Sequence, residues 1–345
     1  MASETTKHPG KARVFIDGEA GTTGLEIRER LEGRHEFALV QLSDADRKDA
    51  KARAGALNDA DVVILCLPDE AARDAVTMIE NPSVRVIDAS SAHRVAPDWV
   101  YGFPELEKDQ RAKIASAKRV SNPGCWPTGF LALVRPLVRA GIVPPDFPLT
   151  VTGVSGYSGG GKSMIEEFEA KDSPRYVETV VRTYALTLSH KHQPEMRVHT
   201  GLAHPPVFSP NVGRFYRGMI VEVPLQLWAL PSKPNVFDLY KEIADAYRGE
   251  KLIEVAGLDR FDLLTTPKTA AQAVQMPPPV GALTQSIDAE MLKLTNGMKL
   301  FVLGNDKTQQ ARLIAVLDNL GKGASGAAVQ NLNIMCGLPE TAGLV

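Results

Sequence analysis

The first third of the chain alternates short apolar runs with segments of helical periodicity. The helical patterns predict helices from Thr23 to Glu32, before Asn58 and after Asp69. The β-branched runs between them predict strands at residues 13–17, 37–42, 61–68 and 84–90. The third run contains VVILCL, whose uniformly apolar character is typical of a strand buried on both faces. Strands that alternate with helices at this spacing predict a parallel sheet covered by helices on both sides.

The pattern changes at Asn122-Pro123, where a longer helical segment begins. Its apolar residues recur on one helix face down to about Ala140, and they are Phe130, Leu131, Leu133, Val134, Leu137 and Val138. Cys125 is therefore expected at or near the N-terminus of this helix.

The second half of the chain predicts an α+β domain. Polar and glycine-rich loops precede two stretches, 205–212 and 215–230, that are typical of antiparallel strands. A helix is predicted from Asn235 to about Arg248, with Val236, Tyr240, Ile243 and Tyr247 on one stripe. Residues 298–306 predict a last strand, and residues 308–334 predict a helix with a glycine-rich interruption at GKGASG.

Composition narrows the class of protein. A chain of 345 residues allows two ordinary domains, and a net charge of -2 argues against a nucleic-acid partner. Cys66, Cys125 and Cys336 are far apart, with neither metal-ligand spacing nor a disulfide framework, which favours a reducing compartment. The first dozen residues lack an apolar signal core, and no stretch is long and apolar enough to cross a bilayer. We expect a cytoplasmic protein with a short disordered head and no membrane partner.

A glycine-rich turn, DGEAGTTG, directly follows the first predicted strand and opens a helix. Gly18, Gly21 and Gly24 allow a tight turn and close approach of a pyrophosphate, whose charge the helix N-terminus would hold. The spacing is GxxGxxG and not the commoner GxGxxG. A plain strand-to-helix turn is therefore the alternative to a dinucleotide site.

The residues after the second predicted strand bear on which dinucleotide is bound. Ser43, Arg47 and Lys48 could bind a 2′-phosphate, which favours NADP over NAD. Asp44 and Asp46 in the same segment argue in the opposite direction.

The motif SNPGCWPTGF places a cysteine at a predicted helix start. A thiolate is a nucleophile that the positive end of a helix and a nearby imidazole stabilise. Gly124 leaves room for a substrate, and Pro127 suits a first helical turn. Cys66 and Cys336 lack this setting. Cys125 is therefore a candidate nucleophile, with a buried helix-start thiol as the alternative.

The motif SHKHQPE places two histidines close together, ahead of a helix expected to start at Pro194-Glu195. A histidine can take a proton from a thiol and return it to an intermediate. His190, His192 and Glu195 also resemble metal ligands, but the spacing is not HExxH and no third ligand is obvious. Solvated or hydrogen-bonded loop histidines are the remaining alternative.

A run of glycines with hydroxyls and a lysine, SGYSGGGKS, predicts an anion-binding nest. Its spacing differs from a P-loop, and Ser158 and Lys162 are its candidate ligands for a phosphate or carboxylate. A flexible linker is the alternative.

Taken in order along nearly the whole chain, these motifs identify a family. With IDASSAHR, YGFPEL and GASGAAVQNLN, the chain resembles the N-acetyl-γ-glutamyl-phosphate reductases, NADPH-dependent enzymes of arginine biosynthesis related to aspartate-semialdehyde dehydrogenase. The loop GEAGTTG resembles the shorter branch of that family. NPGC followed by an aromatic residue and PT, and later by HxHxPE, is a specific combination.

The resemblance implies roles for the site residues. It implies Cys125 as the nucleophile, His192 as the acid/base, and His190 and Glu195 as residues that orient substrate or imidazole. In the mechanism that this implies, Asn122 is a candidate to help the backbone amides hold the oxyanion. Arg94 is a candidate partner for the substrate's phosphate or carboxylate, since such anions need donors and positive charge. The resemblance further implies a pyrophosphate loop at Gly18, Gly21 and Gly24, to which Thr22 and Thr23 donate.

The resemblance also implies the domain organisation. We expect an α/β chain with a Rossmann-like NADP-binding domain at 1–122 and 308–345, in which the GASGAAVQN helix returns to flank the nicotinamide. A catalytic and oligomerisation domain with a mainly antiparallel sheet would occupy 123–307. A homo-oligomer, dimer or tetramer, acting on a small acyl phosphate is expected, with no metal.

Three other functions compete with this one. A reductase of the same architecture could act on aspartyl or amino-adipyl phosphate, although HKHQPE argues against the aspartyl substrate. A nucleotide-binding regulator would use Cys125 only as packing. A cysteine hydrolase would leave the dinucleotide loop without a task.

Overall fold

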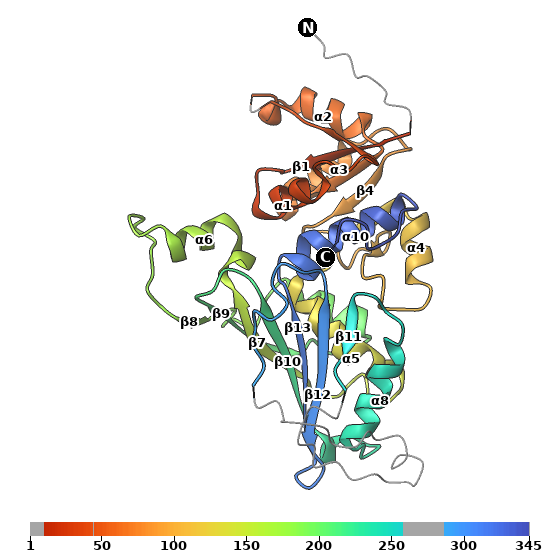
Figure 1. Cartoon of the computed structure of the whole chain (residues 1–345), viewed down its shortest axis with the longest axis vertical. Coiled ribbons are helices and arrows are strands. Elements are labelled where there is room, and N and C mark those ends of the chain that lie inside the picture. The colour runs from red at the N-terminus through yellow and green to blue at the C-terminus, as the bar shows by residue number, and fades with distance from the viewer. Residues whose placement is uncertain (1–9, 44, 258–285, 345) are drawn as a thin grey trace. The chain divides into compact units, whose positions relative to one another are not determined.

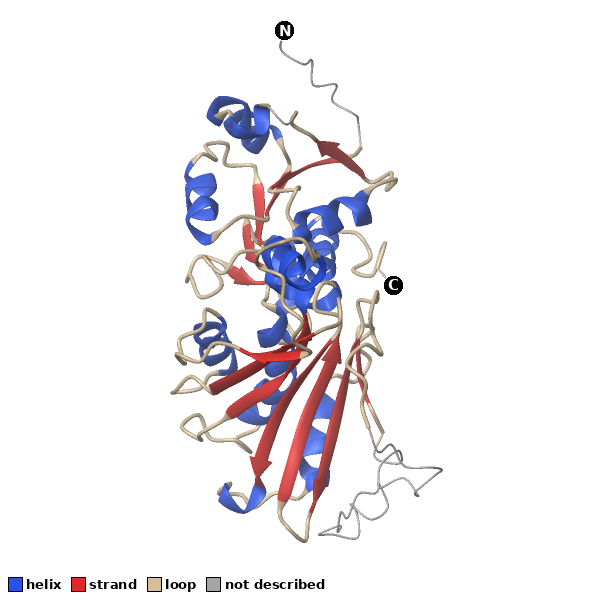
Figure 2. Cartoon of the chain, turned by 90° about the vertical axis from the view of Figure 1, so that its left-hand side faces the viewer, coloured by secondary structure: helices blue, strands red, loops and turns tan. Residues whose placement is uncertain are grey.

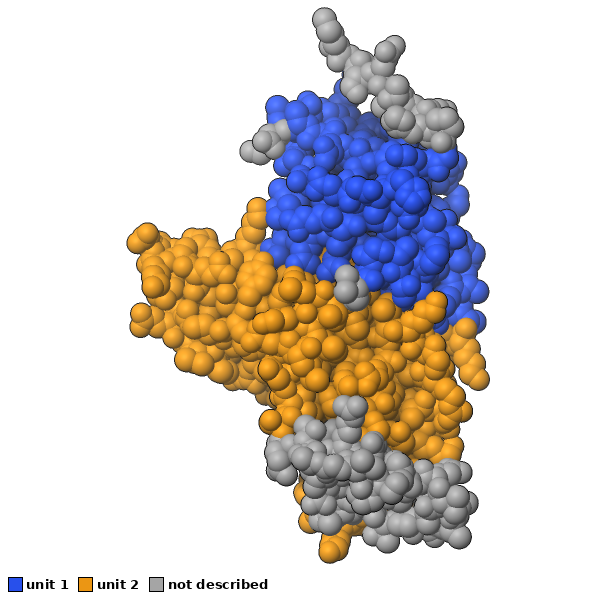
Figure 3. Space-filling view, in the orientation of Figure 1, with its two compact units in different colours: residues 1–104, 109–122, 327–344 blue, residues 105–108, 123–326, 345 orange. Residues whose placement is uncertain are grey.

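The computed structural model describes residues 10–43, 45–257 and 286–344. These residues form two compact units, which Figure 3 draws in different colours. Unit 1 comprises residues up to Pro104, Asp109–Asn122 and Ala327–Leu344, and unit 2 comprises Glu105–Lys108 and Pro123–Gly326. Most of the predicted disordered head lies outside the described residues. No helix in the described ranges is long and apolar enough to cross a membrane.

Unit 1 is built on a parallel sheet, here sheet A, with strand order β2-β1-β3-β4-β6-β5 (Figure 1). Its strands are β1 (Ala12–Asp17), β2 (Phe37–Val40), β3 (Val62–Leu65), β4 (Arg85–Asp88), β5 (Val100–Tyr101) and β6 (Arg119–Ser121). Its helices are α1 (Thr22–Leu31), α2 (Ala50–Asp59), α3 (Asp69–Thr77), α4 (Gln110–Ser116) and α10 (Gly326–Met335), with a short 3₁₀ turn η1 (Asp46–Lys48). Every neighbouring pair of strands is parallel. The predicted doubly wound α/β fold is confirmed.

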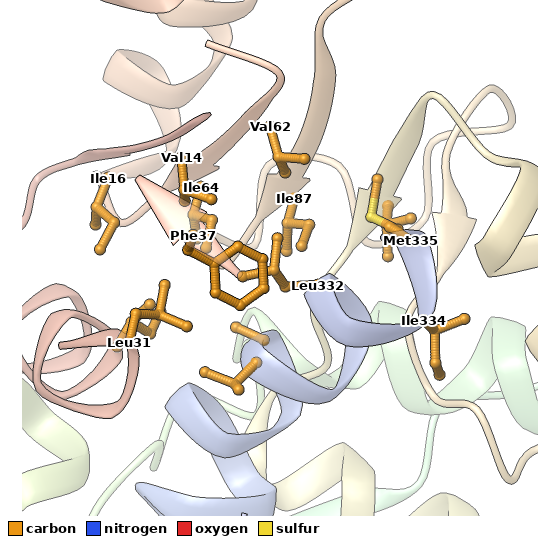
Figure 4. Close-up of a cluster of buried hydrophobic side chains, with 14 of the residues drawn as sticks. Val14, Ile16, Leu31, Phe37, Val62, Ile64, Ile87, Leu332, Ile334 and Met335 are labelled. Carbon is orange, nitrogen blue, oxygen red and sulfur yellow. The ribbon is translucent and has the colours of Figure 1, made fainter. Parts of the chain in front are cut away.

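The alternation of side chains along β1 and β3 divides the core of unit 1 into two layers. Val14 and Ile64 face a cluster formed with α1, α4 and α10, and Phe15 and Val63 face a cluster formed with α2 and α3. Helix α10 contributes Leu332 to the first cluster, beside the strand residues that Figure 4 labels. The C-terminal helix therefore completes the core of unit 1.

Unit 2 is built on a seven-stranded mixed sheet, here sheet B, with order β11-β12-β13-β10-β7-β9-β8. Its strands are β7 (Thr150–Gly156), β8 (Val181–Thr183), β9 (Val207–Gly213), β10 (Met219–Gln226), β11 (Ile253–Val255), β12 (Met298–Asn305) and β13 (Gln310–Leu317). Most pairings are antiparallel, and β11–β12 and β7–β9 are parallel. The predicted α+β unit with a mainly antiparallel sheet is confirmed.

Helices of unit 2 pack on sheet B and connect its strands. They are α5 (Cys125–Arg139), α6 (Gly161–Glu169), α7 (His192–Thr200) and α8 (Val236–Ala246), with 3₁₀ turns η2 (Tyr157–Gly160) and η3 (Leu227–Ala229) and a π-helical turn η5 (Gly321–Ser325). Helix α5 contacts β10, β12 and β13, and α8 contacts β12 and α5, so both helices cover one face of the sheet (Figure 2). Twelve of the fifteen residues of α5 are buried.

The prediction of one interrupted helix over residues 308–334 is wrong. Residues 310–317 form strand β13, which pairs along its whole length with β12 and β10. A short, nearly continuous apolar run fits a buried strand as well as a buried helix, and the two neighbouring strands decide between them. As a result β13 and η5 belong to unit 2, and only residues 327–344 of the predicted 308–345 segment belong to unit 1.

Three further local predictions need correction. The two strands expected at 205–212 and 215–230 do form, as β9 and β10, but β7 lies between them. Helix α7 begins at His192 and not at Pro194. The glycine-rich SGYSGGGKS is not an irregular loop or a linker, because it forms the end of β7, the turn η2 and the first turn of α6.

Replacing Leu332 by Ala tests the place of α10 in the core of unit 1. Leu332 is fully buried, and removing a buried leucine side chain costs about 2–5 kcal/mol of unfolding free energy. Leu25, on α1 of the same unit, is 40% exposed, and Leu25→Ala should cost less than about 1 kcal/mol. Urea unfolding of both variants at one protein concentration measures the difference. Equal losses would show that α10 does not belong to this core.

Candidate active site

Cys125 is the first residue of α5, and the segment ahead of it is held by a buried carboxylate. Gly124, the N-cap residue, donates its backbone N–H to Oε1 of Glu195 at 2.8 Å. Glu195 lies on α7 and is only 1% exposed. The first N–H groups of α5 point toward the Cys125 end and give it positive character. Cys125 thus has the helix-start position that the sequence predicts, and Glu195 fixes the backbone beside it.

The two predicted histidines lie together in the same unit. Their ring centroids are 4.7 Å apart, and the backbone N–H of His192 donates to Nδ1 of His190 at 3.2 Å. The backbone of His190 is fixed in turn by Gln193, whose Oε1 accepts the His190 N–H at 2.8 Å. This arrangement makes Nδ1 of His190 an acceptor and leaves its proton on Nε2.

His192 is the more enclosed of the two histidines. It is buried and forms the first residue of α7. In the part of the chain that the structure describes, no group of three or more His, Cys, Asp or Glu side chains is arranged to hold a metal ion.

An aromatic wall, formed by Trp126, Tyr184 and Phe208, lies beside the two histidines, and Tyr184 is near enough to Cys125 for the charge of the sulfur to act on it. Phe208 lies 5.1 Å from the His190 ring and 5.2 Å from the Trp126 ring, centroid to centroid. Burial and then the negative charge of the Cys125 thiolate raise the pKa of Tyr184, so its hydroxyl stays protonated beside the sulfur.

Tyr184 is absent from the sequence-based set of site residues. It lies six positions ahead of His190, just after strand β8, in a segment without clear periodicity. Its ring meets that of His190 edge to face, with centroids 5.9 Å apart. A tyrosine near the histidine motif is the only signal in the sequence, and it could not be told from any other loop tyrosine.

The glycine turn of unit 1 has the form that a pyrophosphate needs. Gly18 has φ +91°, and a Cβ there would lie 2.4 Å from the carbonyl oxygen of Cys66. Gly21 caps α1, whose Thr22 and Thr23 begin the helix, and a Cβ on Gly24 would lie 2.5 Å from the Gly18 carbonyl oxygen. Oγ1 of Thr22 is buried and makes no hydrogen bond to the described residues. This turn fits the dinucleotide that the sequence predicts.

A pocket of about 220 Å³ opens beside this turn, within unit 1. Arg47 and Arg53 line it, and each is paired with an acidic residue of the turn. Nη2 of Arg47 lies 2.5 Å from Oε1 of Glu19, and Nε of Arg53 lies 2.8 Å from Oδ2 of Asp17. Nη2 of Arg53 is buried and has no hydrogen-bond partner among the described residues. The pocket therefore holds two ion pairs and a guanidinium N–H group of Arg53 without a partner among the described residues.

The other predicted 2′-phosphate ligands differ in their surroundings. Ser43 is exposed, and its hydroxyl donates to Oδ2 of Asp46 at 2.7 Å. Lys48 ends the turn η1, and its side chain lies outside what the structure describes, as does Asp44. Arg53, on α2, is a pocket residue that no sequence motif marks. Only the fold brings α2 beside the glycine turn.

Two predicted substrate ligands of unit 2 lie at the start of α6. The Ser158 hydroxyl is buried and accepts a hydrogen bond from Nδ2 of Asn319 at 2.9 Å. Lys162, the second residue of α6, is exposed. Ser158 thus has a structural partner, and Lys162 faces solvent.

The remaining two predicted substrate ligands, Asn122 and Arg94, belong to unit 1. Arg94 is buried and donates to the backbone carbonyls of Asn122 and Ala89. Oδ1 of Asn122 accepts from Nδ2 of Asn331 at 3.2 Å. These contacts tie the end of β6 to the core of unit 1.

Comparison with known proteins adds a family to this geometry. The family profile described as semialdehyde dehydrogenase, dimerisation domain, matches residues 125–319, and the one described as semialdehyde dehydrogenase, NAD binding domain, matches residues 13–114. An N-acetyl-gamma-glutamyl-phosphate reductase 2 from a Nostoc strain is 50% identical over 97% of this chain and 99% of its own. An N-acetyl-gamma-glutamyl-phosphate reductase from a Chelativorans strain is 51% identical over 94% of this chain and 98% of its own.

Solved structures with the same fold are more distant in sequence. Aspartate semialdehyde dehydrogenase II from Vibrio cholerae matches with a TM-score of 0.68 at 15% identity, over 94% of this chain and 98% of its own. Aspartate semialdehyde dehydrogenase from Candida albicans, solved with NADP, matches with a TM-score of 0.61 at 14% identity, over 94% and 99%. At this level of sequence identity, the structural similarity shows the fold alone.

Alkylation should separate Cys125 from the other two cysteines. Burial raises the pKa of both the Cys66 and the Cys336 thiols, so the reactive thiolate of each is scarcer at neutral pH. We expect iodoacetamide at about pH 7.5 to modify Cys125 at least about tenfold faster than either, read by peptide mass spectrometry. In denaturant all three should react alike. Equal alkylation rates of the three cysteines in the folded protein would contradict the assignment of Cys125 as the reactive thiol.

Proposed function

The chain belongs to the N-acetyl-gamma-glutamyl-phosphate reductase family, and from this we propose that it reduces N-acetyl-glutamyl 5-phosphate to N-acetyl-glutamate 5-semialdehyde. The reaction consumes NADPH, releases phosphate and serves arginine biosynthesis. One observation of the structure carries the assignment: a cysteine begins a long buried helix, near a wall of aromatic residues that lies beside two histidines. Such a site suits acyl transfer to sulfur.

Cys125 supplies the nucleophile. Its thiolate attacks the acyl carbon of the acyl phosphate, and phosphate leaves as the thioester forms. The developing oxyanion is stabilised by backbone N–H groups at the start of α5. Tyr184, whose hydroxyl stays protonated beside the sulfur, is a further donor at this position.

His192 moves the protons. It accepts the thiol proton before attack. After hydride has reached the thioester carbon, it donates a proton to the oxygen of the resulting adduct and takes that proton back as the carbon–sulfur bond breaks, so that the aldehyde carbonyl forms and the sulfur leaves as thiolate. A bound nicotinamide cofactor supplies the hydride that reduces the thioester. His190 holds the loop ahead of α7 through its bond to the His192 N–H, and Glu195 holds Gly124. Both are therefore proposed to position the reacting groups.

The cofactor is proposed to be NADP. The NAD binding domain match over residues 13–114 and the form of the glycine turn support a dinucleotide in unit 1. Arg47 and Arg53 in the adjacent pocket support binding of a 2′-phosphate, since guanidinium groups bind phosphate oxygens in bidentate fashion. The dimerisation domain match over residues 125–319 supports a homo-oligomer, and a small acyl phosphate is the proposed substrate.

Cysteine and histidine variants test the mechanism. We expect Cys125→Ser to bind NADPH as the wild type does and to lose at least about 10³-fold in kcat, because a serine hydroxyl is not ionised at this site. His192→Ala should lose about 10²–10⁴-fold and His190→Ala less. The assay is phosphate-dependent oxidation of N-acetyl-glutamate semialdehyde, with aspartate semialdehyde as the competing substrate. A larger loss in His190→Ala would reverse the two roles, and preference for aspartate semialdehyde would overturn the substrate.

Arg47→Ala tests the choice of cofactor. Loss of a charged hydrogen bond to the 2′-phosphate costs about 1.5–3 kcal/mol, which is roughly a 10- to 150-fold rise in the Kd of NADPH. The Kd of NADH should change less than about threefold, because NADH has no 2′-phosphate. Arg30→Ala on α1, where Arg30 pairs with Glu26, is the matched control and should change neither. An equal rise in the Kd of NADPH and of NADH would contradict recognition of the 2′-phosphate by Arg47.

A further inference from the structure

A buried ion pair in unit 2 joins two sequence motifs to which the mechanism gives no task. Glu105 comes from YGFPEL and Lys322 from GKGASG, 217 positions apart. Nζ of Lys322 lies 2.8 Å from both carboxylate oxygens of Glu105. The Lys322 side chain is 1% exposed and that of Glu105 is 0% exposed. Both charges are thus fully removed from water.

Stability alone is a weak reason for such a pair. Taking two charges out of water costs several kcal/mol per ion, and apolar residues of similar volume often stabilise a protein as well or better. A buried ion pair does fix geometry, because only one arrangement satisfies both charges. The location of the pair therefore indicates what it positions.

Lys322 lies in the π-helical turn η5, which packs directly against the nucleophile. A Cβ placed on Gly323 would lie 2.7 Å from Cβ of Cys125, closer than real Cβ contacts come. The turn is also fixed at its start by Asp318, whose Oδ1 accepts from the backbone N–H groups of Leu320 and Gly321. π-helical turns of this kind are frequent at functional sites. The residue next to Lys322 thus forms one side of the space around Cys125.

The other end of the pair is tied to the helix that carries the nucleophile. Glu107, two residues after Glu105, accepts from Nε of Arg135 at 2.6 Å and from Nη1 of Arg139 at 3.0 Å. Both arginines lie on α5. The segment Glu105–Lys108, which belongs to unit 2, therefore bridges α5 and η5. We name it the bridging segment.

We propose that the bridging segment, through the Glu105–Lys322 pair, positions η5 against Cys125 and so holds the sulfur in its reactive place at the start of α5. Glu105 and Lys322 act through Gly323 and are positioning residues. The proposal rests on the proposed function only in taking Cys125 as the nucleophile. Its consequences for the thiol can be measured without turnover.

A neutral pair separates positioning from stability. Glu105→Met combined with Lys322→Met removes both charges and leaves no charge buried alone, so the fold should survive with a similar unfolding midpoint. We expect kcat to fall about 10- to 100-fold, since displacement of a reacting group by about 1 Å has effects of this size. The Kd of NADPH should stay within about twofold, because the pair does not touch the pocket of unit 1.

The pH dependence of Cys125 alkylation is the readout that stability alone would not change. A sulfur that moves away from the start of α5 loses part of the field that stabilises its thiolate. In the neutral-pair variant, the pH of half-maximal iodoacetamide reactivity at Cys125 should therefore move upward. The matched control replaces the exposed pair Lys241–Asp245 on α8 by two methionines and should leave the profile and kcat unchanged.

Gly323→Ala tests the contact itself, with Gly55→Ala as the control. A methyl group on Gly323 must displace Cys125, and we expect a loss of kcat and the same upward shift of the alkylation profile. Gly55 lies in α2, and a methyl group there would meet no described atom within 4 Å. Gly55→Ala should therefore leave kcat and the alkylation profile unchanged. Unchanged kcat and an unchanged alkylation profile in a folded neutral-pair variant would overturn the proposal. Turnover retained by Cys125→Ser would instead overturn the proposed function, and the alkylation profile would still decide the role of the pair.

Discussion

The hydrogen bond from the Gly124 N–H to the buried carboxylate of Glu195 is the contact on which the proposed site in unit 2 depends. It joins the start of α5 to α7, so the helix that carries the cysteine and the helix that carries His192 are held together at their N-terminal ends. Glu195 is buried, and its carboxylate accepts the Gly124 N–H, which would otherwise be a buried donor without a hydrogen bond. Displacing either helix would break this bond, so the relative positions of sulfur and imidazole are set by backbone geometry.

Much of the fold follows from local sequence patterns, and the exceptions have physical reasons. The strands of sheet A are predictable because short apolar runs alternate with helices, and both faces of the central strands β1, β3 and β4 are buried. Strand β13 is not, because LIAVL satisfies the burial requirement of either a helix or a strand. Only its pairing with β12, the preceding strand, and with β10, which is far away in the sequence, selects the strand.

The site residues divide in the same way. Cys125 and the paired histidines are visible because each combines a reactive side chain with a local helix-start or spacing signal. Tyr184, Arg53 and the Glu105–Lys322 pair carry no such signal, since their importance comes from neighbours far away in the chain. Ser158 has a neighbour that its motif does not predict, because its hydroxyl accepts a hydrogen bond from Asn319, 161 positions away. Sequence identifies reactive groups more readily than the residues that position them.

The charges around Cys125 explain why a carboxylate is tolerated beside a nucleophilic sulfur. The positive end of α5 stabilises the thiolate, but a thiolate that is stabilised too far becomes a weaker nucleophile. Glu195, bonded to the residue before Cys125, opposes the helix field at that point. The protonated Tyr184 hydroxyl adds a donor on the aromatic side. Helix, carboxylate and hydroxyl thus act on the sulfur in different directions, and the proposed thioester mechanism needs a sulfur that ionises and still attacks an acyl carbon.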